Sequence, residues 1–152
     1  MTPLTAAATP DRRPTHGSRV GLLPSVESWL AAASHHGELF AQLDTGVRIA
    51  LLARAAPERM LVWEAGHAGV DARIEPFAGY AASAADMVLA ADDASLAELR
   101  SAAAGRLFEV LRAGIRSGRI VCYTLRRRCV LEERGLDELL DALGYAFMGA
   151  CR

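Results

Sequence analysis

The sequence predicts an α+β fold with about five strands in a mainly antiparallel sheet, an N-terminal helix and a disordered N-terminal tail. Apolar residues recur every three to four positions near the start of the chain, the period changes to two after Gly46, and three strand-like segments then follow with short connections. A length of 152 residues is typical of one domain. We therefore expect a tail over residues 1–22 and a single domain over residues 23–152.

The N-terminal segment changes character near Pro24. Before it, proline, threonine and arginine occur without an apolar period, which is typical of a disordered tail, and the pattern of a signal peptide is missing. After it, Ser25 is placed to cap a helix that we expect to reach about Leu43 and to end before the turn at residues 44–46. One face of this helix holds Val26, Trp29, Leu30 and Ala33.

Five segments are predicted to be strands. Residues 47–51 and 70–75 alternate apolar with polar positions, which is the pattern of a half-buried strand. Residues 59–64 lie between them, and the short connections favour an antiparallel meander. Residues 87–90 form a short apolar run bounded by acids, and residues 119–125 are rich in β-branched and aromatic side chains.

Three further helices are expected around the last strand. Asp92 or Asp93 is placed to cap the first, whose inner face holds two leucines. Residues 107–115 form the second, which has arginines near its end and stops at Gly118. The third is expected from about residue 133 to 147, with a leucine face made of Leu136, Leu139, Leu140 and Leu143.

Composition restricts the partners and the location. The net charge of -1 argues against a general nucleic-acid binder, which has a basic excess over the whole domain. No apolar run approaches the roughly 20 residues of a membrane-spanning helix, so we expect a cytoplasmic protein. All 17 basic residues are arginine and alanine is abundant, which favours a GC-rich bacterial source.

The sequence predicts no catalytic residue, no cofactor and no metal site. His35 and His36 are adjacent, so they point in different directions and favour a surface role at a helix end. His67 lies in a glycine-flanked hairpin without an identifiable partner. The three cysteines form no C-x-x-C pair and are expected to be free thiols. Neither a nucleophile elbow nor a phosphate-binding glycine loop occurs.

Arginines are concentrated in the last third of the chain, with six of them in the segment 112–128. The residues predicted to share one anion-binding face are Arg116, Arg119, Arg126 and Arg128. Such a face suits the phospholipid headgroups of an anionic membrane surface, a coenzyme A phosphate or RNA. The alternative is a solvated strand edge and helix end that charge protects from aggregation.

The order of elements resembles the sterol carrier protein type-two family over roughly residues 47–147. The matching segments are 85–90 (ADMVLA), 94–99 (ASLAEL) and 111–120 (LRAGIRSGRI), which correspond to an alanine-aspartate strand entry, a helix and a G-x-[IL] strand. The resemblance implies a sheet covered by helices on one face, around an apolar tunnel that holds a fatty acyl chain, sterol or quinone-like molecule. It implies no catalytic residue. This chain departs from the family after its last strand, where residues 123–126 replace a Gly-Asp or Gly-Asn turn.

Large adaptable side chains are the candidate ligand-binding residues, because methionine and aromatic groups suit irregular apolar ligands. They are Met60, Trp63, Phe77, Tyr80, Met87, Phe108, Leu111, Tyr123, Leu140 and Phe147. The competing interpretation is that these residues fill a solid core, as every domain of this size requires.

These observations together predict a carrier or accessory protein that binds a lipid-like or other apolar small molecule in an internal cavity. The first alternative is a non-catalytic protein-interaction or regulatory module that forms a homodimer through a strand edge or an apolar helix. The second is a small enzyme that acts on an acyl or aromatic intermediate.

Overall fold

A five-stranded sheet organises the chain in the computed structural model, which describes residues 22–145. The strand order is β3-β2-β1-β4-β5, so the first strand lies at the centre. The strands are β1 (Arg48–Ala53), β2 (Ala56–Gly66), β3 (Gly69–Pro76), β4 (Met87–Ala91) and β5 (Ile120–Thr124). The helices are α2 (Val26–His35), α3 (Gly37–Ala41), α4 (Asp93–Ser101), the 3-10 turn η1 (Ala104–Arg106), α5 (Leu107–Arg116), α6 (Arg128–Glu133) and α7 (Asp137–Ala142).

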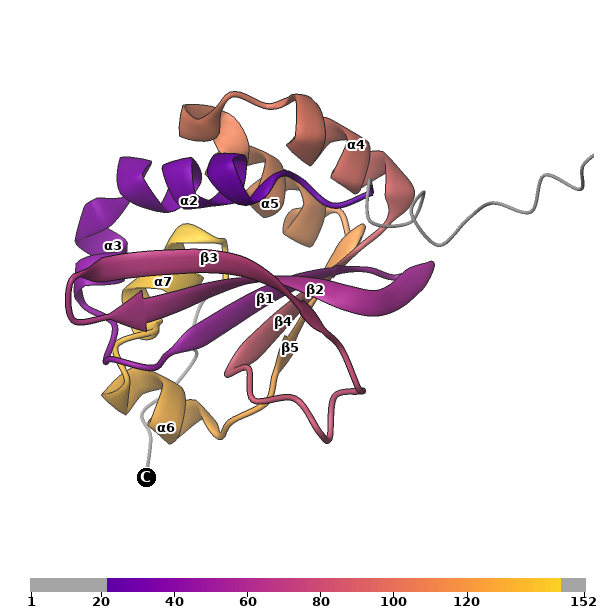
Figure 1. Cartoon of the computed structure of the whole chain (residues 1–152). Helices are drawn as coiled ribbons and strands as arrows, with labels where there is room; N and C mark the ends of the chain where they lie inside the picture. The colour runs from indigo at the N-terminus through magenta and orange to yellow at the C-terminus, as the bar shows by residue number, and fades with distance from the viewer. Residues whose placement is uncertain (1–21, 146–152) are drawn as a thin grey trace, which may run out of the picture.

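Strand pairing is antiparallel except at the centre of the sheet. β1 pairs antiparallel with β2, β2 with β3, and β4 with β5, whereas β1 and β4 run parallel. The parallel pair requires the chain to cross the sheet between β3 and β4, and this connection runs along the bottom of Figure 1. Helices α2, α4 and α5 lie above the sheet in the same view. The predicted α+β class, the strand number and the mainly antiparallel pairing are confirmed.

The face of the sheet under the helices, here called the upper face, carries the main core. Alternate strand residues point into it, with Ile49, Leu61 and Leu89 fully buried. At its centre the indole of Trp29 in α2 stacks on that of Trp63 in β2, with ring centroids 3.6 Å apart and planes 7° from parallel. The Trp63 indole N–H donates a hydrogen bond of 2.6 Å to the backbone carbonyl of Trp29. The sheet and the first helix are therefore joined by both stacking and a hydrogen bond.

The opposite, lower face carries a second and smaller core. Its buried side chains are Ala50, Leu52, Met60, Val62, Ala85, Val88 and Ala90. Phe77 and Leu125 pack against this cluster from the segments that follow β3 and β5. Short side chains such as Ala50 and Ala90 let the connecting segment approach the sheet closely enough to cover it.

Two helical predictions differ from the structure. The N-terminal helix, capped by Ser25 as predicted, is divided at His36 into α2 and α3. The predicted final helix, from about residue 133 to 147, is observed only as α7, its part beyond residue 145 lies outside the described residues, and α6 was not predicted. Gly135 separates α6 from α7, because its φ of +83° lies outside the right-handed helical region, and an added Cβ would collide with the carbonyl of Gln42. The predicted tail also lies outside the described residues, except for Leu22.

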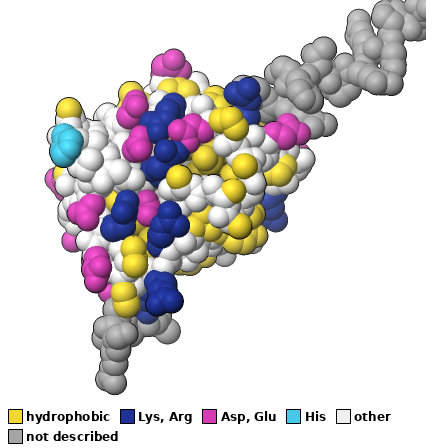
Figure 2. Space-filling view, turned by 60° about the horizontal axis from the view of Figure 1, so that its bottom comes forward, with side chains coloured by type: hydrophobic (Ala, Val, Ile, Leu, Met, Phe, Trp, Pro, Cys, Tyr) yellow, Lys and Arg dark blue, Asp and Glu magenta, His cyan; other side chains and the backbone are white. Residues whose placement is uncertain are grey.

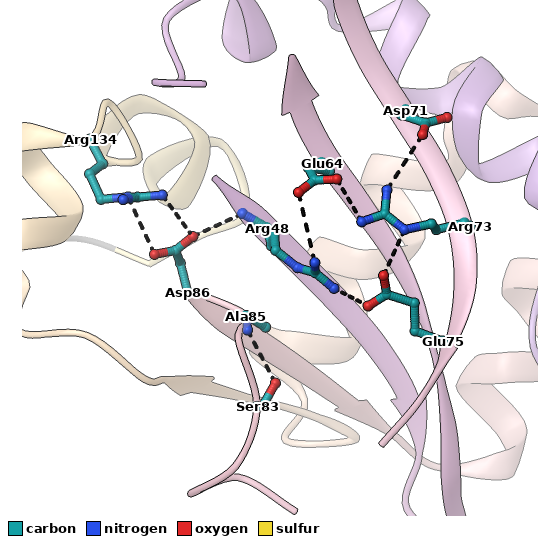
Figure 3. Close-up of polar contacts among 9 residues, drawn as sticks. All are labelled: Arg48, Glu64, Asp71, Arg73, Glu75, Ser83, Ala85, Asp86 and Arg134. Atoms are coloured by element: carbon teal, nitrogen blue, oxygen red, sulfur yellow. Dashed lines mark hydrogen bonds and ion pairs between the residues drawn. The ribbon is translucent and has the colours of Figure 1, made fainter. Parts of the chain in front are cut away.

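A buried carboxylate holds the start of β4 to its neighbours. Asp86 is only 2% exposed, and it accepts a hydrogen bond of 2.9 Å from the backbone N–H of Arg48. The Nε atoms of Arg134 and Arg126 lie 3.3 and 3.6 Å from its Oδ1 atom. Figure 3 shows the carboxylate between Arg48 and Arg134. The Asp86 backbone also bonds to Arg48 and Leu125, so this residue joins β1, β4 and the segment after β5.

Replacement of Asp86 by alanine should destabilise the fold by about 1–3 kcal/mol, because the backbone N–H of Arg48 and two partly exposed guanidinium groups lose their acceptor. The free energy of unfolding from urea titration measures this loss. The matched control is Asp71→Ala, since Asp71 is 74% exposed and its ion pair with Arg73 should contribute no more than about 1 kcal/mol. Equal unfolding free energies for the two variants would contradict this role of Asp86.

Candidate functional site

A groove of about 380 Å³ lies between helices α2 and α3 and the hairpin of β2 and β3. We call it the hairpin groove. Its apolar lining includes Ala33, Phe40, Leu43, Ala65 and Val70. Two exposed polar residues, Ser34 and His67, also line it. The groove is therefore lined by apolar side chains and by polar atoms in similar measure, and the polar side chains lie where it meets solvent.

Small residues leave this space open. Ala33, Gly37 and Ala41 recur every four residues along α2 and α3, and Gly66 and Gly69 face them from the hairpin. A Cβ atom added at Gly37 would meet no other atom within 4 Å. These short residues leave the hollow between the helices and the hairpin unfilled.

Phe40 connects the groove to the aromatic core. Its ring lies edge-on to Trp63, with centroids 5.1 Å apart, and it also contacts Phe108 at 6.2 Å. Trp63 in turn stacks on Trp29. These are the two tryptophans of the sequence, so a molecule in the hairpin groove would be separated from Trp63 by one ring and from Trp29 by two.

The polar residues of the groove form no catalytic pair. The Ser34 hydroxyl donates to the carbonyl of Leu30 at 3.2 Å, and His67 makes no hydrogen bond or ion pair within residues 22–145. No group of three or more His, Cys, Asp or Glu side chains in the described part of the chain could hold a metal ion. The arrangement can surround an apolar group and offer weak polar contacts at its mouth.

His36 is half-buried at the end of α2, where a surface role was predicted for it. Its ring lies 4.1 Å from that of Phe108, and its Nε2 atom is buried without a hydrogen-bond partner. Burial and, to a lesser extent, the adjacent His35 lower the pKa of His36 below its ordinary value of 6.5. The predicted position of both histidines at a helix end is correct, since His35 ends α2 and His36 caps it.

The structure divides the predicted ligand-binding residues between the two faces of the sheet. The group in the upper core is fully or almost fully buried and consists of Trp63, Met87, Phe108, Leu111 and Leu140. The group on the lower side consists of Met60, Phe77, Tyr80 and Tyr123. Phe147 lies outside the described residues. None of these residues lines the hairpin groove.

The lower group forms an aromatic cluster at the surface. The rings of Phe77 and Tyr80 are 5.1 Å apart, and those of Tyr80 and Tyr123 are 4.6 Å apart. Tyr80 is 38% exposed and Tyr123 is 41% exposed. Partial burial raises the pKa of the Tyr80 hydroxyl above its ordinary value, with a smaller contribution from Tyr123. The Tyr80 hydroxyl is thus neutral at physiological pH and can donate a hydrogen bond.

The four arginines of the predicted anion-binding face lie at two ends of β5. Arg116 and Arg119 precede the strand, whereas Arg126 and Arg128 follow it. Three of them have acidic neighbours: Arg119 meets Glu98 at 3.4 Å, Arg126 meets Asp86, and Arg128 meets Glu132 at 3.4 Å. β5 ends at Thr124 and Arg128 begins α6, so the strand alternation that would place Arg126 and Arg128 on one face does not extend to them.

The cysteines differ from one another. Cys122 is a free, buried thiol as predicted, and burial raises its pKa to about 12, so it is protonated and unreactive at neutral pH. The prediction of a free thiol is wrong for Cys129, which is disulfide-bonded.

Sequence reasoning missed the hairpin groove. The available signal was the spacing of Ala33, Gly37 and Ala41, which places small residues on one side of the helical segment. The hollow also requires the glycines of a hairpin about 30 residues later, and their approach to the helix depends on the folded sheet.

Comparison with known proteins gives a weak structural likeness. No protein-family model and no curated protein matches the chain. A solved structure titled "UbiJ-SCP2 Ubiquinone synthesis protein" is similar to it, with 19% sequence identity and a TM-score of 0.41 over 90% of this chain and 99% of that one. In the described part, no helix is both long and apolar enough to cross a membrane.

The buried position of His36 predicts acid sensitivity. Because the pKa of His36 is lower in the folded protein, the unfolded chain binds a proton more readily. Stability should therefore fall as the pH decreases below about 6.5, toward the lowered pKa. His36→Phe keeps a ring against Phe108 but cannot titrate, so it should lose less stability over this range.

The urea concentration at half unfolding, determined at about pH 7.5, 6.5 and 5.5, measures the effect. This midpoint follows stability when the dependence of the unfolding free energy on urea concentration is constant. His67→Gln, which changes a histidine in an exposed turn, is the control and should behave as the wild type. If the urea midpoint of His36→Phe fell with pH as much as that of the wild type, this explanation would be wrong.

Proposed function

We propose that this protein is a carrier or accessory protein that binds the apolar part of a small, lipid-like molecule in the hairpin groove. The observation that carries the proposal is an open hollow, lined in part by apolar side chains, that adjoins the aromatic core through Phe40. At about 380 Å³ it falls within the range of roughly 300–1,000 Å³ that small-molecule sites occupy. Its location differs from the internal cavity expected from the sequence.

The physical basis of binding is removal of apolar surface from water. Phe40, Leu43 and Val70 present carbon surface to the groove, and each 100 Å² buried against a ligand stabilises the complex by roughly 2.5 kcal/mol before the entropy cost of association. A chain or ring of a few carbon atoms fits such walls. If the ligand has one polar end, that end would lie near the exposed residues Ser34 and His67.

Binding without turnover is the simplest use of this chemistry. The Ser34 hydroxyl donates to a backbone carbonyl and lacks a base in contact, and the His67 ring has no acidic partner among the described residues. Activation of a serine requires an adjacent base that is itself oriented by a third group. These contacts favour a carrier over the small-enzyme alternative.

Gly37→Leu tests the site, because Gly37 lines the groove, a Cβ atom there meets no other atom within 4 Å, and leucine favours the helix. Titration of the wild type with palmitate should give a saturable change in the fluorescence of Trp29 and Trp63. The variant should bind at least about tenfold more weakly, which corresponds to about 1.4 kcal/mol. Ala97→Leu, which adds the same bulk on an exposed position of α4, is the matched control and should bind normally.

Native mass spectrometry of freshly purified protein provides an independent readout. A bound apolar molecule that is lost from Gly37→Leu and kept by Ala97→Leu would support the proposal. Absence of both a copurified molecule and a saturable fluorescence change would refute it. So would equal binding by the two variants, since the ligand would then occupy another place.

A further inference from the structure

The connection between β3 and β4 exposes a field of apolar side chains on the lower side of the molecule. Residues 77–85 contain no charged side chain. The exposed apolar residues of this segment are Ala78, Tyr80, Ala81, Ala82 and Ala84. In Figure 2, which brings this side forward, hydrophobic side chains form a broad field beside a group of basic and acidic ones. A continuous exposed apolar surface of this kind is typical of an interaction site.

Tyr80 and Tyr123 form the rigid centre of this field. Their rings are in contact at 4.6 Å although they come from the connection and from β5, and Phe77 supports Tyr80 from the other side. Both tyrosines keep more than a third of their surface exposed. Aromatic residues held in this way supply large contact area at low entropy cost, and they are enriched where proteins associate.

Charge is distributed unevenly across the lower face. On the side of β3, the carboxylates of Glu64, Asp71 and Glu75 surround only two guanidinium groups, those of Arg48 and Arg73 (Figure 3). One carboxylate therefore remains in excess on this side.

The side of β5 has the opposite excess. There the single carboxylate of Asp86 meets the guanidinium groups of both Arg126 and Arg134. Arg127, which follows in the chain and is exposed, makes no ion pair within residues 22–145. The face is thus negative toward one edge strand and positive toward the other.

We propose that the partner of this face is a second copy of the chain, in a two-fold dimer whose axis lies in the interface and runs parallel to the strands. Rotation about such an axis places the β3 side of each subunit against the β5 side of the other, so unlike charges meet twice while the two apolar fields meet at the centre. An axis across the strands would instead bring like charges together. An anionic membrane fits less well, because the carboxylate excess near β3 would face it.

The proposal is independent of the hairpin groove, whose residues lie on the helical side of the sheet. Sedimentation velocity of the full chain over a hundredfold range of concentration should show a monomer–dimer equilibrium. Tyr80→Ser should weaken the dimer at least tenfold, because it removes the centre of the contact. Leu30→Ser, which changes an exposed apolar residue on α2, is the control and should leave the dimer unchanged.

Charge exchange tests the direction of the axis. Asp71→Arg and Arg127→Asp should each weaken the homodimer, since each brings like charges together at both symmetric contacts. An equimolar mixture of the two variants should recover the dimer, because both contacts of the mixed dimer then join unlike charges. The double variant Asp71→Arg, Arg127→Asp should recover it as a homodimer for the same reason. Both positions are exposed, so thermal unfolding should show folded proteins throughout.

A wild type that is monomeric at every concentration would overturn the proposal. So would a dimer that Tyr80→Ser leaves intact, or single charge variants that weaken the dimer but fail to recover it when mixed. Binding of the monomer to vesicles that contain anionic lipid, without dimer formation, would assign the face to a membrane instead.

Discussion

The stack of Trp29 on Trp63 is the contact on which the upper half of the molecule depends. It is reinforced by the hydrogen bond from the Trp63 indole to the Trp29 carbonyl, so α2 is held in position both along and across β2. Phe40 and Phe108 then pack around Trp63, each adding an aromatic contact worth about 0.5–1.5 kcal/mol beyond its buried area. With the helix fixed in this way, Ala33 and Phe40 face the hairpin, and the space between them becomes the groove.

The two faces of the sheet are covered by different kinds of structure. The upper face is covered by helices with long apolar side chains, which interdigitate with residues such as Leu51 and Leu89. The lower face is covered by an irregular segment, and a loop can approach a sheet closely only where the side chains between them are short. Ala50, Ala85 and Ala90 meet this condition. The cost of such a thin cover is that apolar atoms of the loop remain on the surface.

Local patterns in the sequence predicted the elements well, because capping and periodicity act over a few residues. Ser25 caps α2 through the N–H of Ser28, and Asp92 caps α4 through that of Ser95, as their positions predicted. The change of period after Gly46 located the meander correctly. Helix α6 was missed, and its end at Gly135 lies where the chain approaches the backbone of Gln42, which is distant in the sequence.

The candidate site was harder to predict, because it depends on which residues the fold brings together. Alternation within β2 alone separates Met60 from Trp63, since residues three apart on a strand point to opposite faces, and this could have been recognised beforehand. The arginines near β5 are close in sequence, but the five residues of that strand separate their two groups by roughly 16 Å at about 3.3 Å per residue. The groove arises from small residues on two elements, and no local pattern shows that these elements meet.

The central place of β1 has a consequence for how the chain is made. When β1 leaves the ribosome, β2 can pair with one of its edges almost at once, but the other edge belongs to β4. Residues 54–86 must be synthesised first, which takes on the order of 2–7 seconds at about 5–20 residues per second. Throughout this interval the nascent meander has an apolar, unpaired edge at what will be the middle of the sheet. Translation speed over this stretch therefore sets how long the growing chain is exposed to incorrect pairing.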